Sequence, residues 1–270
     1  MKSILITGCS SGIGYDTAHY LHNNGYRVYA TARDEEDVKR LAQEGLDAYV
    51  LDVTCEEDIE KMLTIITKEG ELYAVFNNAG YGQPGAVEDI RTKVLKEQFE
   101  TNFFGLHELT YQALKIMRKQ GYGRILQHSS VLGIIALRFR GSYNASKYAI
   151  EGLCDTLRLE LMGSNIFVST INTGPVHSDF RKNATKMFQK NVQIEGSFFE
   201  EAYKDELLSD KEKEDDSFTK GSEVVIANIL HALESKKPKP RYYNTFATHL
   251  LGGLKRLLST RILDKILVKI

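Results

Sequence analysis

The sequence predicts a single α/β domain, with a doubly wound parallel sheet of about seven strands and helices on both faces. Short apolar runs alternate with amphipathic stretches along most of the chain, and this alternation favours βαβ units. A glycine-rich turn directly after the first apolar run is typical of a strand that leads into a helix. The 270 residues suit one domain with a sizeable core, without an internal repeat or an interdomain linker.

The predicted strands are short runs rich in apolar residues. They lie at Ile4–Thr7, Arg27–Thr31, Ala48–Asp52, Ala74–Asn77, Arg124–His128, Phe167–Ile171 and Arg241–Tyr243. The predicted helices fill the gaps, because apolar residues recur there at helical spacing. They lie at about 13–24, 35–44, 56–69, 92–119, 144–162 and 222–234.

Two segments stand outside this alternation. Residues 175–220 form a long insertion after the sixth strand, and such connections are usually functional or mobile. Residues 246–270 extend beyond the last strand. We therefore expect a body of residues 1–245, which includes a lid at about 175–220, and a C-terminal basic amphipathic helical extension at 246–270. Within this extension, Gly252 and Gly253 should loosen the first turn, so that the ordered helix begins at Leu254.

Composition excludes several classes of protein. The net charge of −1 gives no global field that points to nucleic acid. The three cysteines, Cys9, Cys55 and Cys154, show neither a disulfide framework nor zinc-ligand spacing, so no metal site is expected. The first strand leaves no room for a signal peptide, and no run approaches the length of a transmembrane helix. We expect a reduced, soluble, cytoplasmic protein.

The turn after the first strand has the sequence Thr7-Gly8-Cys9-Ser10-Ser11-Gly12-Ile13-Gly14. Gly8 would allow the tight turn, Gly12 the approach of a pyrophosphate to the backbone, and Gly14 close packing of helix on strand. The phosphates would lie at the positive N-terminus of the following helix. A turn that only needs flexible residues is the alternative, but it does not require this order after a buried strand.

Ligands of open parallel sheets bind beyond the carboxyl ends of the strands. The polar and glycine residues at this edge follow successive strands: Gly8, Arg33, Asp52, Asn77–Gly80, Ser129, Ser130 and Asn172–Val176. Residues far apart in sequence therefore converge on one edge of the sheet.

Tyr143 and Lys147 lie four residues apart in a stretch with helical character, so both side chains share one helical face. A phenol beside a fixed ammonium can donate and accept a proton, since the positive charge lowers the phenol pKa. The pair alone also fits a solvated lysine beside a half-buried tyrosine.

Taken together, Thr7–Gly14, Asn77-Asn78-Ala79-Gly80 and Tyr143-x-x-x-Lys147 resemble the short-chain dehydrogenase/reductase family, in its shorter single-domain branch. The resemblance covers residues 1 to about 235. It implies a Rossmann-type fold, an NAD(P)-dependent oxidoreductase acting on CH–OH groups, and a homodimer or homotetramer. Tyr81-Gly82 and the glycine turn are similar to the branch with 17β-hydroxysteroid dehydrogenase type 1, retinol dehydrogenases and acyl-dihydroxyacetone-phosphate reductase.

The resemblance assigns catalytic roles to four residues. Hydride transfer to a carbonyl leaves an alkoxide that must take a proton, and Tyr143 is the expected acid. Lys147 would lower its pKa and hold the nicotinamide ribose. Ser130 would donate a hydrogen bond to the substrate oxygen, so Ser130 and Tyr143 would bind substrate, whereas neighbouring Ser129 should be structural. Asn102 would support a water link to Lys147; without the resemblance, a polar residue that bends a helix is the better interpretation.

Cofactor choice depends on the tip of the second strand, Tyr29-Ala30-Thr31-Ala32-Arg33-Asp34. An acidic residue there would pair with the adenosine ribose hydroxyls, whereas an arginine suits a 2′-phosphate. Arg33 therefore favours NADP(H) over NAD(H), although Asp34 follows it directly. Asp52 matches the residue that contacts the adenine amino group; it could also cap a helix, a role that Thr54 would fill better. The expected cofactor-binding residues are Gly8, Ser10, Ser11, Gly12, Ile13, Arg33, Asp52, Val53, Asn78, Ala79, Gly80, Tyr143, Lys147, Gly174, Val176 and Ser178.

One loop departs from the family pattern. Asn172-Thr173-Gly174-Pro175-Val176 carries Thr173 where the family has a proline, which puts the rigidity of this loop in question. Gly174 and the backbone at Val176 should still reach the nicotinamide carboxamide. His128 should pack beside its strand rather than transfer protons.

The lid is rich in apolar residues, which suggests a lipophilic substrate that is steroid-, retinoid- or acyl-chain-like, or a hydrophobic aldehyde. These residues are Phe180, Met187, Phe188, Val192, Ile194, Phe198, Phe199, Leu207, Leu208 and Phe218. About half of them could merely pack the lid onto the body. Residues 195–216 carry ten Asp and Glu against three Lys, and we expect this segment to order over bound substrate.

Two other functions remain open from the sequence. One is a catalytically silent NADP-binding regulator, against which the complete set of Ser130, Tyr143 and Lys147 argues. The other is a peripheral membrane reductase of lipid metabolism, because residues 246–270 combine helically spaced leucines with five basic residues. Packing of this helix on its own domain or on a second subunit is the favoured alternative.

Overall fold

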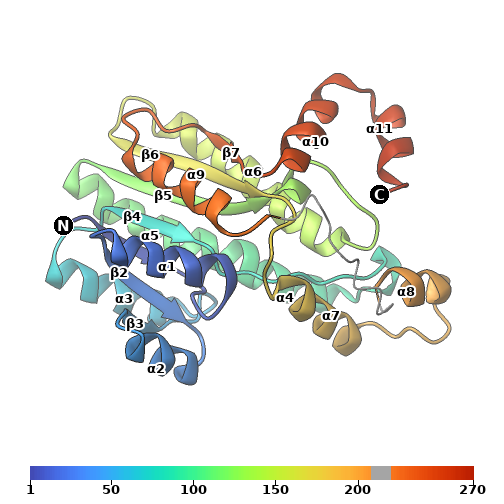
Figure 1. Cartoon of the computed structure of the whole chain (residues 1–270), viewed down its shortest axis with the longest axis horizontal. Helices are drawn as coiled ribbons and strands as arrows, with labels where there is room; N and C mark the ends of the chain where they lie inside the picture. The colour runs from blue at the N-terminus through green and yellow to red at the C-terminus, as the bar shows by residue number, and fades with distance from the viewer. Residues whose placement is uncertain (208–219) are drawn as a thin grey trace.

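A seven-stranded parallel sheet forms the centre of the protein in the computed structural model, which describes residues 1–207 and 220–270, except the Glu206 side chain. The strand order is β3-β2-β1-β4-β5-β6-β7 (Figure 1). The strands are β1 (Ser3–Ile6), β2 (Arg27–Ala32), β3 (Asp47–Val50), β4 (Ala74–Asn77), β5 (Gly123–Ser130), β6 (Ile166–Thr173) and β7 (Arg241–Tyr243). The prediction of a doubly wound parallel sheet of about seven strands is confirmed.

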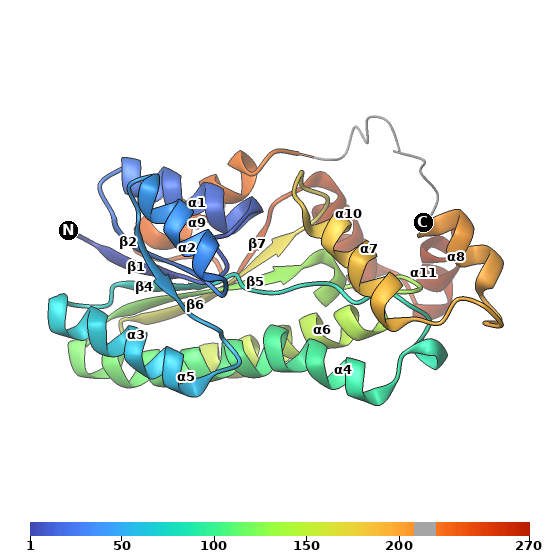
Figure 2. The same ribbon diagram turned by 90° about the horizontal axis from the view of Figure 1, so that it is seen from below.

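Helices cover both faces of the sheet, as Figure 2 shows. On one face, α1 (Gly12–Asn23), α2 (Glu35–Gln43) and α9 (Glu223–Glu234) pack on side chains such as Ile4 and Ile6. On the other face, α3 (Glu56–Glu69), α5 (Gly105–Gln120) and α6 (Gly141–Glu160) pack on side chains such as Leu5 and Val75. Successive residues of β1 therefore point to opposite faces, and both faces are apolar, as a buried parallel strand requires.

β5 and β6 are longer than predicted and lie in register over eight residue pairs, from Gly123 opposite Ile166 to Ser130 opposite Thr173. Ser129 and Ser130 therefore end a strand instead of following it. Polar residues at these ends are tolerated because the neighbouring strand pairs with their backbone. Short turns at Val87–Asp89 and Val131–Gly133 are 3₁₀-helical.

The predicted helix at 92–119 is interrupted. The chain forms α4 (Thr92–Phe99), a π-helical turn at Glu100–Phe104, and then α5. This wider turn points the Asn102 side chain inward, so that the residue is only 1% exposed. Single π-turns within α-helices are frequent at functional sites. α5 then begins at Gly105, where a Cβ atom would lie 2.4 Å from the Val53 carbonyl oxygen, so only glycine fits.

The insertion contains two helices that the sequence did not predict, α7 (Phe180–Asn191) and α8 (Glu200–Glu206). Its apolar side chains Phe188, Val192 and Tyr203 pack with Ala86 and Phe139 of the body. Part of the apolar lid therefore packs onto the body, which was the alternative interpretation. Residues 208–216, with Leu208, and Phe218 lie outside the described residues.

The C-terminal extension forms α10 (Phe246–Leu257) and α11 (Thr260–Leu267). The expectation that the helix begins only at Leu254 is wrong. Thr245 caps α10 by accepting a hydrogen bond from the Thr248 N–H at 3.3 Å, and Gly252 lies against the Tyr243 ring, which a Cβ atom would approach to 3.1 Å. Packing and capping thus outweigh the low helix propensity of two glycines.

Among the residues that the structure describes, none of the helices has both the length and the apolar character needed to span a membrane.

Candidate active site

The carboxyl ends of the central strands and the turns that follow them form the candidate site. The structure brings the glycine turn after β1, the Asn77–Gly80 turn after β4, the end of β5 and the loop after β6 to this edge of the sheet (Figure 1). Tyr143 and Lys147 come from the first two turns of α6, which packs beside β5 and β6. The predicted convergence on one edge is therefore observed.

The glycine turn is held in a shape that side chains would disrupt. Gly8 and Gly12 have positive φ angles of 71° and 58°. A Cβ atom on Gly8 would lie 2.9 Å from the Ala79 Cα, and one on Gly14 would lie 2.3 Å from the Gly8 carbonyl oxygen. Gly8 and Gly14 thus allow close packing between this turn and the turn after β4, as the glycine pattern predicts.

The N-terminus of α1 suits an anion. Its N-cap residue Ser11 makes no side-chain hydrogen bond to the helix, and the first turn contains no acidic residue. The first backbone N–H groups of a helix have no partners within it, and the helix dipole makes this end positive. The residues present here therefore fit the pyrophosphate of a dinucleotide.

Asn78 and Thr7 lock the two turns together. Asn78 Nδ2 donates hydrogen bonds to the carbonyl oxygens of Thr7 and Gly8, both at 2.9 Å. Thr7 Oγ1 accepts hydrogen bonds from the N–H groups of Asn78 and Ala79, both at 3.0 Å. The Asn78 side chain thus fixes the shape of the glycine turn. Direct binding of cofactor by Asn78, Ala79 and Gly80 stays a prediction.

His128 connects the turn after β4 with the loop after β6. Its Nδ1 lies 2.8 Å from Asn78 Oδ1, and its Nε2 lies 3.0 Å from Thr173 Oγ1. Because Asn78 Oδ1 can only accept, Nδ1 carries the proton, and Thr173 then donates to Nε2. Burial and the nearby Lys147 ammonium lower the pKa of His128 to about 3, so this imidazole is neutral near pH 7.

Thr173, at the position where the family pattern has a proline, is fixed by hydrogen bonds. Besides contacting His128, its Oγ1 accepts a hydrogen bond from Asn244 Nδ2 at 3.1 Å. Asn244 Oδ1 in turn accepts one from Asn228 Nδ2 at 2.7 Å. A chain of polar side chains therefore supplies the rigidity that a proline ring would give this loop, which answers the question raised by the sequence.

Tyr143, Ser130 and Lys147 lie together and are all buried. Tyr143 and Ser130 share a side-chain hydrogen bond. Lys147 Nζ lies 5.5 Å from the centre of the Tyr143 ring and donates a 2.6 Å hydrogen bond to the His128 carbonyl oxygen. Ser130 Oγ also lies 3.3 Å from the Thr173 carbonyl oxygen, to which it can donate. The predicted side chains of Tyr143, Ser130 and Lys147 therefore lie close together at the end of β5.

The pKa of Tyr143 is not lowered in this structure, in contrast to the prediction. Burial raises it above its ordinary value, because the phenolate would lose water, and the hydrogen bond with Ser130 opposes this only in part. The phenol is therefore protonated near pH 7, the form that an acid needs. Burial also lowers the pKa of Lys147 to about 8, while the charge of Glu151 acts to raise it.

Asn102 is fixed by hydrogen bonds to Tyr81 and Ser146. Its Nδ2 donates to the Tyr81 carbonyl oxygen at 2.9 Å and to Ser146 Oγ at 3.3 Å, while its Oδ1 accepts from the Tyr81 N–H at 3.0 Å. These bonds fix the start of the loop that follows Gly80. The structure does not bring the Asn102 side chain into contact with Lys147, and the water link between them stays a prediction.

The adenosine end would lie at the tips of β2 and β3. Arg33 is exposed, and among the described residues no carboxylate pairs with it. Asp34 caps α2 by accepting a 3.0 Å hydrogen bond from the Glu36 N–H. Asp52 Oδ1 accepts hydrogen bonds from Thr54, at 2.9 Å from the N–H and 2.8 Å from the hydroxyl. α3 starts after Cys55, so neither Asp52 nor Thr54 is its N-cap residue.

The loop after β6 closes on the glycine turn. A Cβ atom on Gly12 would lie 3.2 Å from the Ser178 Cβ, and one on Gly174 would lie 2.2 Å from Thr245 Oγ1. Ser178 therefore lies near the N-terminus of α1. Contact of Gly174 and Val176 with a nicotinamide carboxamide stays a prediction. Ile13 contributes its side chain to the core, so only its backbone faces this turn.

Apolar walls enclose the space around Tyr143. The Phe180 ring of α7 lies 5.3 Å from the Tyr143 ring, centre to centre. The loop after Ser130 packs against the C-terminal helices, since Val131 and Ile135 form a buried cluster with Leu263 and Leu267. Two segments distant in sequence, the lid with α7 and α8 and the C-terminal extension with α10 and α11, lie at the same end of the molecule, as Figure 2 shows.

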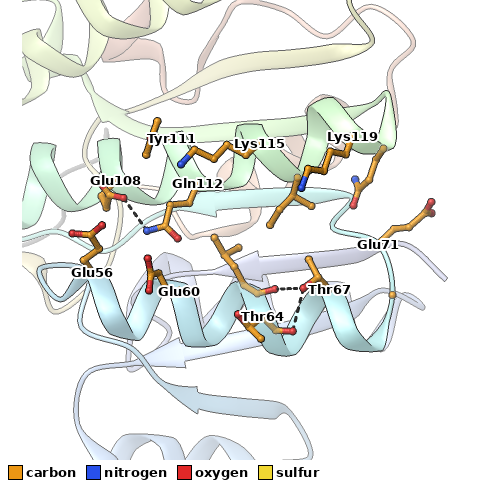
Figure 3. Close-up of a pocket in the computed structure, with 14 residues that line it drawn as sticks. Glu56, Glu60, Thr64, Thr67, Glu71, Glu108, Tyr111, Gln112, Lys115 and Lys119 are labelled. Atoms are coloured by element: carbon orange, nitrogen blue, oxygen red, sulfur yellow. Dashed lines mark hydrogen bonds between the residues drawn. The ribbon is translucent and has the colours of Figure 1, made fainter.

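A surface groove also lies outside this site. Figure 3 shows it between α3 and α5, lined by charged and polar side chains such as Glu60, Glu108, Lys115 and Lys119. It contains none of the predicted site residues and is a solvated surface groove. Among the described residues, no cluster of three or more histidine, cysteine or acidic side chains could hold a metal ion.

Sequence reasoning missed Arg40, which supports the glycine turn. Its Nη2 donates a 2.6 Å hydrogen bond to the Ser10 carbonyl oxygen, and its guanidinium lies 5.5 Å from the Tyr15 ring centre. Ion pairs to Asp37 and Glu44 hold it there. Nothing in the spacing of a basic residue on an acidic helix indicates this role, because it depends on how α2 packs across the turn. The roles of Thr7 and Asn244 were missed for the same reason.

Comparison with known proteins gives consistent results. Residues 2–189 match the family model described as short chain dehydrogenase. The uncharacterized oxidoreductase YbbO of Escherichia coli is 39% identical over 98% of this chain and 94% of its own length. Human retinol dehydrogenase 8 is 36% identical over 66% of this chain and 60% of its own length. A crystal structure of a short-chain dehydrogenase from Streptomyces avermitilis superposes with a TM-score of 0.78, at 26% identity, covering 98% and 93% of the two chains.

Proposed function

Because the chain belongs to the short-chain dehydrogenase/reductase family, and is thus an NAD(P)-dependent oxidoreductase acting on CH–OH groups, we propose that it reduces a carbonyl on a lipophilic substrate with NADPH. The reverse oxidation of the alcohol is the same chemistry. The observation that carries the proposal is the buried group of Tyr143, Ser130 and Lys147 beside the glycine turn.

Tyr143 would donate the proton. A nicotinamide cofactor with its pyrophosphate at the glycine turn would supply the hydride, and the carbonyl oxygen then needs an acid within hydrogen-bond reach. The raised pKa keeps Tyr143 protonated near pH 7, and Ser130 would donate a hydrogen bond to the same oxygen. In the oxidation direction, Tyr143 would take the proton back. Ser130 and Tyr143 would therefore bind substrate as well as act on it.

Lys147 would hold the cofactor and assist Tyr143. Its ammonium is buried 5.5 Å from the phenol ring, and among the described residues its one hydrogen-bond acceptor is the His128 carbonyl oxygen. Two of its N–H groups remain for ribose hydroxyls, since an ammonium has three donors. A positive charge at this point would also stabilise the phenolate that forms when the proton leaves.

The tip of β2 supports NADPH over NADH. Arg33 is an exposed cation, and the neighbouring carboxylate of Asp34 is engaged in capping α2. The Arg40 guanidinium is paired with Asp37 and Glu44, so Arg33 is the cation that the proposal assigns to the phosphate. A 2′-phosphate there would meet a guanidinium rather than an acidic side chain.

The walls of the site support a lipophilic substrate. Phe180 stands beside Tyr143, and the loop after Ser130 carries Leu132, Ile134 and Leu137, which pack with the C-terminal helices. The name of retinol dehydrogenase 8 fits this class of substrate. Homodimer or homotetramer formation and a cytoplasmic location also stay predictions.

The test is NADPH oxidation measured against a panel of steroids, retinal, aliphatic aldehydes and acylated ketones, with NADH in parallel. We expect turnover on at least one lipophilic carbonyl and a preference for NADPH. A short polar carbonyl of matched reactivity serves as the control substrate. Tight NADPH binding without turnover on any member would instead favour a catalytically silent regulator.

A further inference from the structure

The two C-terminal helices present two apolar faces. The inward face packs on the loop after Ser130, through Leu251, Leu254, Leu258, Leu263 and Leu267. An amphipathic helix that packs on its own domain needs only this face. Packing on the domain therefore does not explain why the outward face of these helices is also apolar.

The outward face combines exposed apolar and basic side chains. On α10, Phe246, Leu250 and Leu257 recur at spacings of four and seven, and Leu257 is 83% exposed. On α11, Ile262 and Lys265 are spaced by three residues and both are exposed, and the exposed Lys269 follows just after the helix. Figure 1 shows both helices standing out from one end of the sheet.

Positive charge is concentrated in the C-terminal extension. Residues 246–270 contain five basic residues, all exposed, and one acidic residue, Asp264, which gives a net charge of +4. Because the whole chain carries −1, residues 1–245 carry −5. A cationic, partly apolar surface on an acidic body matches the chemistry of an anionic membrane surface.

A cavity of about 350 Å³ opens on the same helices. It lies between α11 and the loop after β5, and Leu137, Tyr148, Leu263 and Leu267 line it, with Lys255 among its polar residues. The loop that forms its wall continues back to Ser130. The same helices therefore border an opening with both apolar and charged side chains.

We propose that the outward face of α10 and α11 docks on an anionic lipid surface. A second copy of this chain fits less well, because a two-fold interface would place two faces of charge +4 against each other. The cations would attract the surface, and Leu250, Leu257 and Ile262 would enter the interfacial region. The proposal does not rest on the reaction or the substrate, since its readout is binding to vesicles.

Co-sedimentation with vesicles of phosphatidylglycerol or of phosphatidylcholine tests the proposal on the full chain. We expect the protein to pellet with the anionic vesicles at low salt and to be released as salt rises. The charge variant K255Q/R256Q/R261Q/K265Q/K269Q and the apolar variant L250S/L257S/I262S should each bind at least about tenfold more weakly. All eight residues are exposed, so these variants should fold.

The matched control is K68Q/K93Q/K96Q/R118Q/K119Q. It removes five exposed cations from α3, α4 and α5, so its net charge equals that of the charge variant. It should pellet like the wild type. Failure of the wild type to pellet with anionic vesicles, or equal losses in both charge variants, would overturn the proposal. Conversion of a dimer to a monomer by L250S/L257S/I262S in light scattering would also overturn it, by assigning the face to a second copy.

Discussion

His128 shows how a side chain remote from the reaction can hold the site together. It joins Asn78, which fixes the glycine turn, to Thr173, which fixes the loop after β6. Its carbonyl oxygen accepts the hydrogen bond of Lys147. In the neutral imidazole Nδ1 donates to Asn78 and Nε2 accepts from Thr173, and protonation would reverse the second of these hydrogen bonds.

This arrangement predicts a loss of stability in acid. The folded-state pKa of about 3 lies below the ordinary value of 6.5, so below pH 6.5 the unfolded chain binds the proton more readily. The free energy of unfolding should therefore fall as pH drops from 6.5 toward 3, by about 1–2 kcal/mol between pH 6.5 and 5 from this residue. Urea unfolding of wild type and His128→Asn would measure it. Identical pH slopes for the two proteins would contradict the assignment.

Lys147 predicts a loss of cofactor affinity in base. Its pKa of about 8 means that the ammonium is present below pH 8 and is lost as pH rises through that value. NADPH binding should thus weaken between pH 7 and 9.5. A bound anion would raise the pKa of Lys147 and so move this loss of affinity to higher pH. Lys147→Met should bind more weakly at every pH, without this trend, and should also lose turnover. Fluorescence titration of NADPH gives both curves, and parallel curves would exclude Lys147 as the group responsible.

Arg33 predicts the choice between cofactors. Replacing it with Ala should raise the KM for NADPH by about ten- to hundredfold, since a charge-assisted hydrogen bond contributes about 1.5–3 kcal/mol. The KM for NADH should change little, because NADH has no 2′-phosphate. Arg91→Ala removes another exposed cation and serves as the control. Equal changes for NADPH and NADH would show that Arg33 does not contact the phosphate.

At the scale of elements, regular segments were predictable and irregular ones were not. The strands and most helices follow from apolar periodicity, which the sequence displays directly. The π-turn that buries Asn102 leaves no such trace, because the flanking residues fit an uninterrupted helix. The start of α10 was misjudged because the contact of Gly252 with Tyr243 is a tertiary effect.

Tyr203 is one of the residues that attach the lid to the body. Tyr203 packs against Phe139 and Phe188, with ring centres 5.2 and 4.9 Å away, and its hydroxyl accepts a 2.8 Å hydrogen bond from the buried Ala86 N–H. The same hydroxyl donates to Asp89. Ordering of residues 195–216 over a bound substrate stays a prediction, because residues 208–216 lie outside those described.

Tyr203→Phe should loosen this attachment while keeping the ring. The Ala86 N–H would lose its partner in a buried position, at a cost of about 1–3 kcal/mol. Hydrogen exchange should become faster at residues 84–90 and 197–207. Tyr20→Phe, which removes an exposed hydroxyl, should leave exchange there unchanged. Unchanged exchange in Tyr203→Phe would mean that ring packing alone holds the lid.

At the scale of the whole molecule, the motifs predicted which residues meet at the carboxyl edge of the sheet, but not the hydrogen bonds that hold them there. Gly8, Ser130, Tyr143 and Lys147 were predictable because their spacing matches a known chemistry. The supporting network of Thr7, His128, Thr173 and Asn244 was not, because its members come from four segments whose contact only the fold creates. The direction of the Tyr143 pKa was also missed, since burial cannot be obtained from sequence spacing.

The central claim is that Tyr143 transfers the proton at a site that NADPH occupies. Turnover and NADPH affinity of Tyr143→Phe, measured on the best lipophilic carbonyl, test it most directly. Removal of one hydroxyl should lower turnover by about 10²–10⁴-fold and leave the dissociation constant of NADPH within about twofold of wild type. Wild-type turnover in Tyr143→Phe would contradict the proposed role of this residue and the mechanism built on it.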